Sequence, residues 1–249
     1  MVAYLASYFV PAKAAIFNTF HTRGPSGSEA PAGDPTGPRR LDTPLYILVN
    51  GGTGSASESF PYTLQAAHRA TIVGEPTNGR ANPGGFIRVS SGFAVFVSSG
   101  SPENPITHTN WEGKGVQPDI AVPSDEALTR AEELALQRLL DAAPQGPDAA
   151  ELHWLLADMQ ARPPTLSTSD LAAYSGGYGK EASISADNGA LVLHQGRRAT
   201  RLKPIATDVF VAALDPILHA QFERQGGRVI ALSLVTPRGP IARFTRPAP

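Results

Sequence analysis

Residues 45–58 have the sequence Leu45-Tyr-Ile-Leu-Val-Asn-Gly-Gly-Thr-Gly-Ser-Ala-Ser-Glu58, in which an apolar run passes through glycines into a serine. The run at 45–49 predicts a buried strand, and the helical spacing of the apolar residues in 60–67 predicts a helix directly after it. The glycines between them permit a tight turn. Ser55 would therefore lie at a corner where the unpaired N–H groups of the first helical turn can stabilise a developing oxyanion.

The same stretch has three other interpretations. Ser55 and Glu58 fit a capping box, and on local sequence alone this structural role is the simpler one. The glycines also fit a dinucleotide-binding turn with Glu75 as the ribose-binding acid, but Ser57 replaces the third glycine and repeated βα units do not follow. A nucleophile elbow requires glycine two residues on either side of the serine, where this chain has Thr53 and Ser57.

Two further segments follow in order, Gly74-Glu-Pro-Thr-Asn-Gly-Arg80 and Thr109-Asn-Trp-Glu-Gly-Lys-Gly-Val-Gln-Pro-Asp119. Together with the stretch around Ser55, they resemble the serine peptidase family that includes the C-terminal processing (tail-specific) proteases, the tricorn protease core and the modules of interphotoreceptor retinoid-binding protein. The resemblance covers about residues 1–140. Each segment alone is weak evidence, but three in the family's order and spacing are specific.

The resemblance implies roles for particular residues. It makes Ser55 the nucleophile, the backbone N–H of Ala56 one donor of the oxyanion hole, and Glu112 the acidic member of a Ser-His-Ser-Glu relay. In such a relay, a histidine removes the hydroxyl proton as the serine attacks the carbonyl. The processing proteases use a lysine where this chain has Arg80, whose guanidinium stays protonated at any working pH. The histidine version is therefore implied.

The family's histidine lies well before the first strand of the core, together with the second serine of the relay and a Gly-rich turn that supplies the second oxyanion donor. This chain opens on residues 1–9, which resemble the helix that follows that turn. We therefore expect the chain to be the C-terminal portion of a longer peptidase and to be inactive alone. Of the six histidines, only His108 lies in a segment expected to approach Ser55.

Composition excludes several classes of function. With 249 residues, 41% of them hydrophobic, and a formal net charge of −1, the chain can form one large or two modest cores and has no charge bias toward nucleic acid. It has no cysteine, and no histidine pairs with carboxylates at metal-ligand spacing, so we expect no disulfide, metal or other cofactor. No stretch has the apolar length of a transmembrane segment. Residues 1–10 lack the charged start of a signal peptide, while the resemblance implies a periplasmic or cell-envelope location.

We expect three regions in an α/β chain. Residues 1–142 would be the C-terminal portion of the peptidase core, a partial layered core of the ClpP and crotonase type by resemblance. Within it, 24–44 would be a flexible loop, because eight of the fifteen residues from 24 to 38 are Gly or Pro. Missing strands would leave a sheet edge free for self-association. Residues 143–165 would be a linker and a helix, and 166–249 an accessory β-rich domain.

The last part of the chain has the pattern of short antiparallel strands. We expect strands at 182–185, 190–194, 208–212, 229–235 and 241–244, with a turn at Asp187-Asn-Gly189. The segments that resemble the small β-barrel-like module appended to bacterial serine hydrolases and some peptidases are Leu171–Tyr178, Asn188–Leu191 and Arg201–Ile205. We assign this domain no chemistry.

Two functions from different classes fit these features. The first is a serine-type peptidase that acts on peptide or protein substrates through an acyl-enzyme on Ser55. The second is a non-catalytic binding protein for small apolar ligands, because the retinoid-binding members use the same scaffold without proteolysis. The retention of both Ser55 and Glu112 favours the peptidase.

Overall fold

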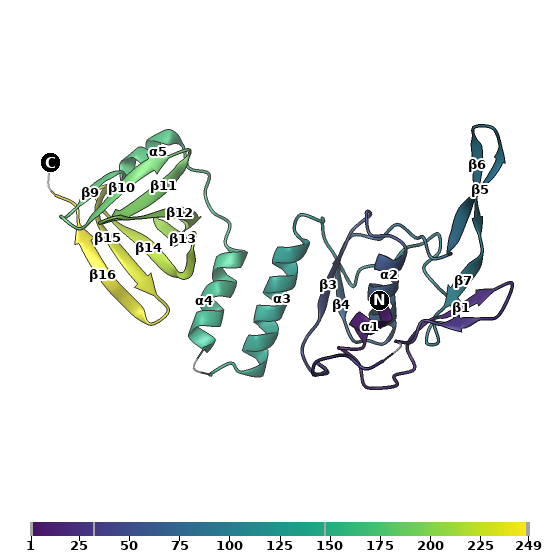
Figure 1. The fold of residues 1–249 in the computed structure, drawn as a ribbon. Helices are drawn as coiled ribbons and strands as arrows, with labels where there is room; N and C mark the ends of the chain where they lie inside the picture. The colour runs from purple at the N-terminus through teal and green to yellow at the C-terminus, as the bar shows by residue number, and fades with distance from the viewer. Residues whose placement is uncertain (1, 32, 147, 248–249) are drawn as a thin grey trace. The chain divides into compact units, whose positions relative to one another are not determined.

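The computed structural model describes residues 2–31, 33–146 and 148–247. The chain forms two compact units, Met1–Glu132 and Glu133–Pro249 (Figure 1). The first is a mixed α/β unit, and the second consists of helices and one antiparallel sheet. The elements of the first unit are α1 (Val2–Ala6), β1 (Thr19–Thr22), β2 (Gly27–Ser28), β3 (Tyr46–Val49), α2 (Ala56–Ala66), β4 (Thr71–Gly74), β5 (Gly84–Ser90), β6 (Phe93–Ser98), β7 (Gly100–Glu103) and β8 (Ile120–Ala121).

A parallel βαβ arrangement carries the candidate nucleophile. β3 and β4 pair in parallel, with Val49 opposite Gly74 at their carboxyl ends, and β8 extends the sheet beyond β4. α2 connects β3 to β4 and packs its fully buried Leu64 against α1 and the segment that follows α1. The predicted order of strand, glycine turn, helix and strand is confirmed. Within the described ranges β3 pairs with β4 alone, so its other edge is free for pairing.

The segment predicted to be a flexible loop makes several contacts with the rest of the first unit. β2, which lies within it, pairs with β1. The Arg39 guanidinium donates hydrogen bonds to the carbonyl oxygens of Ser7 and Val10, and Arg69 donates to the carbonyls of Arg40 and Thr43. These contacts anchor both ends of the segment, and its flexibility stays a prediction.

The hairpin β5–β6 projects from the rest of the first unit as a two-stranded ribbon (Figure 1). Its two strands pair antiparallel, with Phe86 opposite Phe96. The exposed apolar side chains of this ribbon are Phe86, Ile87, Val89, Phe93, Val95, Phe96 and Val97. A two-stranded ribbon is marginally stable by itself, and a contiguous apolar patch on a surface promotes association.

We expect the apolar ribbon to drive self-association of the isolated chain. A Phe86→Ser/Phe93→Ser double substitution should lower the apparent mass and its concentration dependence in multi-angle light scattering, because these side chains are 78% and 71% exposed. Leu214→Ser is the matched control, since Leu214 is 91% exposed but belongs to the second unit and not to the ribbon. An association unchanged in the double variant, or lost equally in the control, would contradict the prediction.

Helix α3 (Ala127–Ala142) crosses the division between the units. The other elements of the second unit are α4 (Ala149–Gln160), α5 (Thr168–Tyr174), β9 (Gly176–Tyr178), β10 (Ala182–Asp187), β11 (Ala190–Gln195), β12 (Arg198–Ala206), β13 (Val209–Ala212), β14 (Asp215–Gln225), β15 (Arg228–Thr236) and β16 (Gly239–Thr245). The predicted helix of the linker region corresponds to α4.

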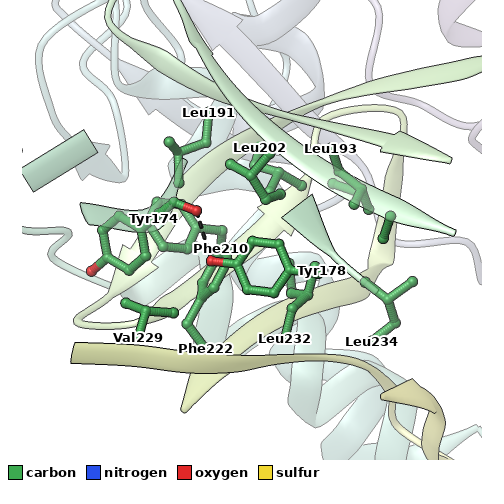
Figure 2. Close-up of a cluster of buried hydrophobic side chains, with 14 of the residues drawn as sticks. Tyr174, Tyr178, Leu191, Leu193, Leu202, Phe210, Phe222, Val229, Leu232 and Leu234 are labelled. Atoms are coloured by element: carbon green, nitrogen blue, oxygen red, sulfur yellow. Dashed lines mark hydrogen bonds between the residues drawn. The ribbon is translucent and has the colours of Figure 1, made fainter. Parts of the chain in front are cut away.

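The eight strands β9 to β16 form one antiparallel sheet in which every strand pairs with its neighbours in sequence. The sheet curls into a nearly closed barrel around a single apolar core (Figure 1). In this core the rings of Tyr174, Tyr178 and Phe210 lie between leucines of β11 and β12 and side chains of β14 and β15 (Figure 2). The small antiparallel β domain predicted from the sequence is confirmed.

Arg246 connects the two ends of this sheet. Arg246 directly follows β16, and its guanidinium donates to the carbonyl oxygens of Ala173 and Ser175 just before β9. The same guanidinium lies 5.7 Å from the ring centroid of Tyr178. Burial raises the pKa of the Tyr178 hydroxyl to about 12, and that hydroxyl donates to the Tyr174 carbonyl at 2.6 Å. Tyr174 and Tyr178 thus have a structural role, as packing residues of the barrel core.

A buried histidine attaches α4 to the barrel. His219 of β14 bonds through Nε2 to the Asp158 carboxylate at 2.6 Å, and the Trp154 ring lies 4.1 Å from the imidazole, centroid to centroid. His219→Ala should lower the free energy of unfolding of the second unit by about 3 kcal/mol, because it leaves Asp158 without its buried partner. Thermal unfolding of the variant checks this decrease. His153→Ala is the control, because His153 is an exposed residue of α4. Equal melting temperatures in the two variants would contradict it.

Candidate active site

Ser55 lies at the predicted corner, directly before the first residue of α2. Its backbone has φ 55° and ψ −123°, a sparsely populated conformation for a residue with a side chain, which costs about 1–3 kcal/mol. Strain of this kind persists where the surrounding structure enforces it, and it concentrates at active sites. Ser55 is also exposed, so its hydroxyl is accessible to a substrate.

The first turn of α2 leaves one N–H group free beside Ser55. The N–H of Ser57 donates to the Gly54 carbonyl at 3.1 Å, and that of Glu58 donates to the Ser55 carbonyl at 2.8 Å. In the part of the chain that the structure describes, the N–H of Ala56 has no acceptor. Ala56 can therefore donate to an oxyanion formed at Ser55, as its role in the resemblance requires.

Glu58 holds the strained backbone of Ser55 through a hydrogen bond. Its side chain is fully buried, and one carboxylate oxygen, Oε2, accepts the backbone N–H of Ser55 at 2.7 Å. The pair forms the capping box that the local sequence predicts, and this hydrogen bond to the Ser55 N–H is its carboxylate half. The carboxylate also accepts from the Thr77 hydroxyl at 2.5 Å, from the Gly79 N–H at 2.6 Å and from the Arg80 N–H at 2.9 Å.

These four donors decide the charge of Glu58. Burial by itself raises the pKa of the carboxyl, but the hydrogen bonds from Thr77, Gly79, Arg80 and Ser55 outweigh it and leave the pKa below its usual value. Glu58 is therefore ionised at neutral pH although it is buried without a cationic partner among the residues described. Its charge is balanced by hydrogen-bond donors, three of them from the backbone.

Glu112 binds the next two backbone N–H groups of the same loop. Its Oε2 accepts from Ala81 at 2.7 Å and from Asn82 at 2.8 Å. The loop at 79–82 thus presents four consecutive N–H groups, two to Glu58 and two to Glu112. This arrangement, which we call the two-carboxylate clamp, brings the segments of Ser55 and Glu112 to one loop. The structure records no direct contact between these two side chains.

Arg80 lies inside the clamp. Its backbone N–H and that of Ser55 donate to the same oxygen, Oε2 of Glu58. The position that holds lysine in the processing proteases is therefore next to the candidate nucleophile. Arg80 is exposed, and its guanidinium has no hydrogen bond or ion pair with any residue of the described ranges.

The structure brings no histidine to Ser55 among the residues it describes. The backbone N–H of His108 donates to the Asn104 carbonyl, and the adjacent Thr107 hydroxyl bonds to Tyr62 at 2.9 Å, about two turns along α2 from Ser55. His21 pairs instead with Glu103 at 3.2 Å. The general base stays unassigned, and the role of Glu112 in a relay stays a prediction.

Residues 2–122 match the profile of peptidase family S41. This part of the chain belongs to that family. The resemblance inferred from the three segments is thereby confirmed, and the β-barrel-like unit that follows lies outside the matched residues.

The S41 region is similar to C-terminal processing proteases. It is 35% identical over 109 residues to the carboxyl-terminal-processing protease of Synechocystis sp.. The matched residues make up 42% of this chain and 25% of that relative. It is also 39% identical over 80 residues to the chloroplastic carboxyl-terminal-processing peptidase 2 of Arabidopsis thaliana, and this match makes up 32% of this chain and 15% of that protein. The chain thus spans a quarter or less of the length of these relatives.

Among solved structures, a photosystem II D1 C-terminal processing protease matches 49% of this chain and 30% of its own, with 25% identity and a TM-score of 0.36. Among residues 2–31, 33–146 and 148–247, no helix combines the length and the apolar character that crossing a membrane requires.

Proposed function

We propose that the protein to which this chain belongs is a serine-type peptidase that hydrolyses peptide bonds through an acyl-enzyme on Ser55. The observation that carries the proposal is the strained, exposed serine beside the free N–H of Ala56, within a region of family S41. The Ser55 hydroxyl attacks the scissile carbonyl, the oxyanion accepts from Ala56, the amine leaves, and water hydrolyses the ester.

The attack requires a base that takes the hydroxyl proton. Arg80 cannot serve, and no described histidine reaches Ser55, so we propose that a His-Ser segment outside this chain supplies the base and that Glu112 orients it. The chain alone would then be inactive. A layered core of the ClpP and crotonase type, a peptide or protein substrate, and a periplasmic or envelope location belong to the same proposal.

The alternative function, binding of small apolar ligands, finds less support in the first unit. The cavity near α1 has a volume of about 360 Å³, and apolar residues such as Val10 and Phe17 line it together with the charged Lys13, Asp34 and Arg39. Pockets for apolar ligands are lined mostly by hydrophobic and aromatic side chains with few polar groups. Three charged residues in so small a lining make this cavity a weaker match for a retinoid-like ligand.

Labelling and turnover test the peptidase. A fluorophosphonate probe should label this chain weakly or not at all, while the full-length protein encoded by the gene should be labelled and should cleave casein or a peptide library. Ser55→Ala should lower that turnover by about a thousandfold or more, and Ser57→Ala, a nearby exposed serine, should not. Turnover unchanged in Ser55→Ala would end the proposal. Robust labelling of this chain that His108→Ala abolishes would show that the base is present after all.

A further inference from the structure

The two-carboxylate clamp fixes the backbone on both sides of Arg80. The N–H groups of residues 79 to 82 all donate to Glu58 or Glu112, at 2.6–2.9 Å. A close approach restricts the loop further: a Cβ added at Gly79, whose φ is +81°, would lie 2.9 Å from the backbone nitrogen of Gly115. The guanidinium of Arg80 therefore extends from a fixed point, while its own side chain stays exposed.

The two carboxylates that bind the backbone around Arg80, those of Glu58 and Glu112, already accept hydrogen bonds. Both carboxylates of the clamp accept backbone N–H groups, and neither forms an ion pair with Arg80 in the described part of the chain. Other exposed arginines do have such partners: Arg243, for example, donates two hydrogen bonds to Glu223. Arg80 is thus a free cation placed one carboxylate away from the backbone of Ser55.

A guanidinium with free N–H groups binds a carboxylate in a bidentate manner and distinguishes it from a neutral amide. The start of α2, with the free N–H of Ala56, adds positive potential on the same side as Ser55. We propose that Arg80 is a specificity-determining residue that binds a carboxylate of the substrate close to the scissile bond. This inference rests on the proposed function, because it takes Ser55 as the reacting residue.

The carboxylate has two sources in a peptide, the C-terminal carboxyl group and the side chain of Asp or Glu. Three peptides of otherwise identical sequence distinguish them: one with a free C-terminus, one amidated, and one amidated with a single Gln→Glu exchange. Titrations into the Ser55→Ala form of this chain, followed by NMR at the Nε–H of Arg80, measure binding without any turnover. Loss of the signal in Arg80→Lys assigns it.

We expect a carboxylate peptide to bind about tenfold more tightly than the amidated one and to shift the Arg80 Nε–H signal. The preference should weaken with added salt and disappear in Arg80→Gln. Arg88→Gln is the matched control, because Arg88 is an exposed arginine of the same unit that lies in β5, and it should keep the preference. Equal binding of acidic and amidated peptides, no binding of any of them, or a preference that survives Arg80→Gln would overturn the inference.

The outcome is separable from that of the peptidase proposal. Full-length protein that depends on Ser55 for turnover but ignores the carboxylate would remove the inference about Arg80 and leave the peptidase. A carboxylate preference that depends on Arg80, in a full-length protein whose turnover ignores Ser55, would leave a carboxylate-binding site and remove the peptidase.

Discussion

Glu58→Gln should lower the free energy of unfolding of the first unit by about 3 kcal/mol and should release Ser55 from its strained conformation. The carboxylate accepts four hydrogen bonds in a fully buried position. A glutamine of the same size offers one oxygen and one NH₂ group, so the NH₂ group faces donors instead of an acceptor for them. The cost of leaving buried donors unpaired exceeds the net value of an ordinary hydrogen bond.

Two measurements test the effect of Glu58→Gln, one of stability and one of the reactivity of Ser55. Because the chain has two tryptophans, Trp111 in the first unit and Trp154 in the second, denaturation in a Trp154→Phe background reports on the first unit through Trp111. In the full-length protein, the rate of fluorophosphonate labelling reports on Ser55. Glu126→Gln, an exposed site, is the control. A Glu58→Gln variant with the stability and labelling rate of the control would show that the clamp is not needed.

The pKa of Glu58 also predicts a dependence of stability on pH. Its pKa is lower in the folded chain than the value of about 4.3 expected for an unfolded one, so the unfolded state binds a proton first as the pH falls. The stabilisation from Glu58 is therefore complete above about pH 5 and decreases as the pH falls through the unfolded and then the folded pKa. In Glu58→Gln this part of the acid sensitivity of the first unit should be absent.

The strained conformation of Ser55 depends on the buried carboxylate of Glu58, which accepts the Ser55 N–H. Holding Ser55 in its conformation costs about 1–3 kcal/mol, which hydrogen bonds to a charged group are strong enough to offset. The same carboxylate oxygen orders the loop that contains Arg80. A change in that loop is therefore transmitted to the nucleophile through a single side chain, without any contact between Arg80 and the Ser55 hydroxyl.

The local part of this site could be predicted from the sequence. An apolar strand, three glycines and an amphipathic helix place Ser55 at a corner because each step depends on neighbouring residues only. The burial predicted for the whole strand was wrong: of β3, Val49 alone is buried, and Leu48 is 43% exposed. The bonds from Thr77, Gly79 and Arg80 to Glu58 join residues about twenty positions apart. A capping box explains Glu58 completely at the local level, so nothing in the sequence pattern pointed to its distant partners.

In the second unit, the strands that were not predicted are β9, β12 and β14. β9 has two glycines in three residues, and β14 begins with Asp215-Pro216, a pair typical of turns. β12 contains Pro204, which lies where the register with β13 shifts, so the missing N–H is tolerated there. Partners on both sides hold β12 and β14 in the sheet, and β10 holds β9 at its edge, in spite of their weak local preference.

Gly74→Ala should destabilise the first unit by about 3 kcal/mol or more, as large an effect as that at Glu58. Gly74 ends β4 with φ +130°, and an added Cβ would lie 2.0 Å from the carbonyl oxygen of Val49. That oxygen accepts the N–H of Glu75 at 3.0 Å, so a side chain here must separate the carboxyl ends of β3 and β4.

The separation would act on the corner where Ser55 lies, because Val49 is followed by the turn that leads into α2. We therefore expect Gly74→Ala to lose both stability, measured through Trp111, and Ser55 labelling in the full-length protein. Gly85→Ala is the matched control: Gly85 lies in a strand of the same unit, and a Cβ there would meet nothing within 4 Å. If Gly74→Ala kept the stability of that control, β3 and β4 could not be as closely paired as the site requires, since the corner before α2 depends on that pairing.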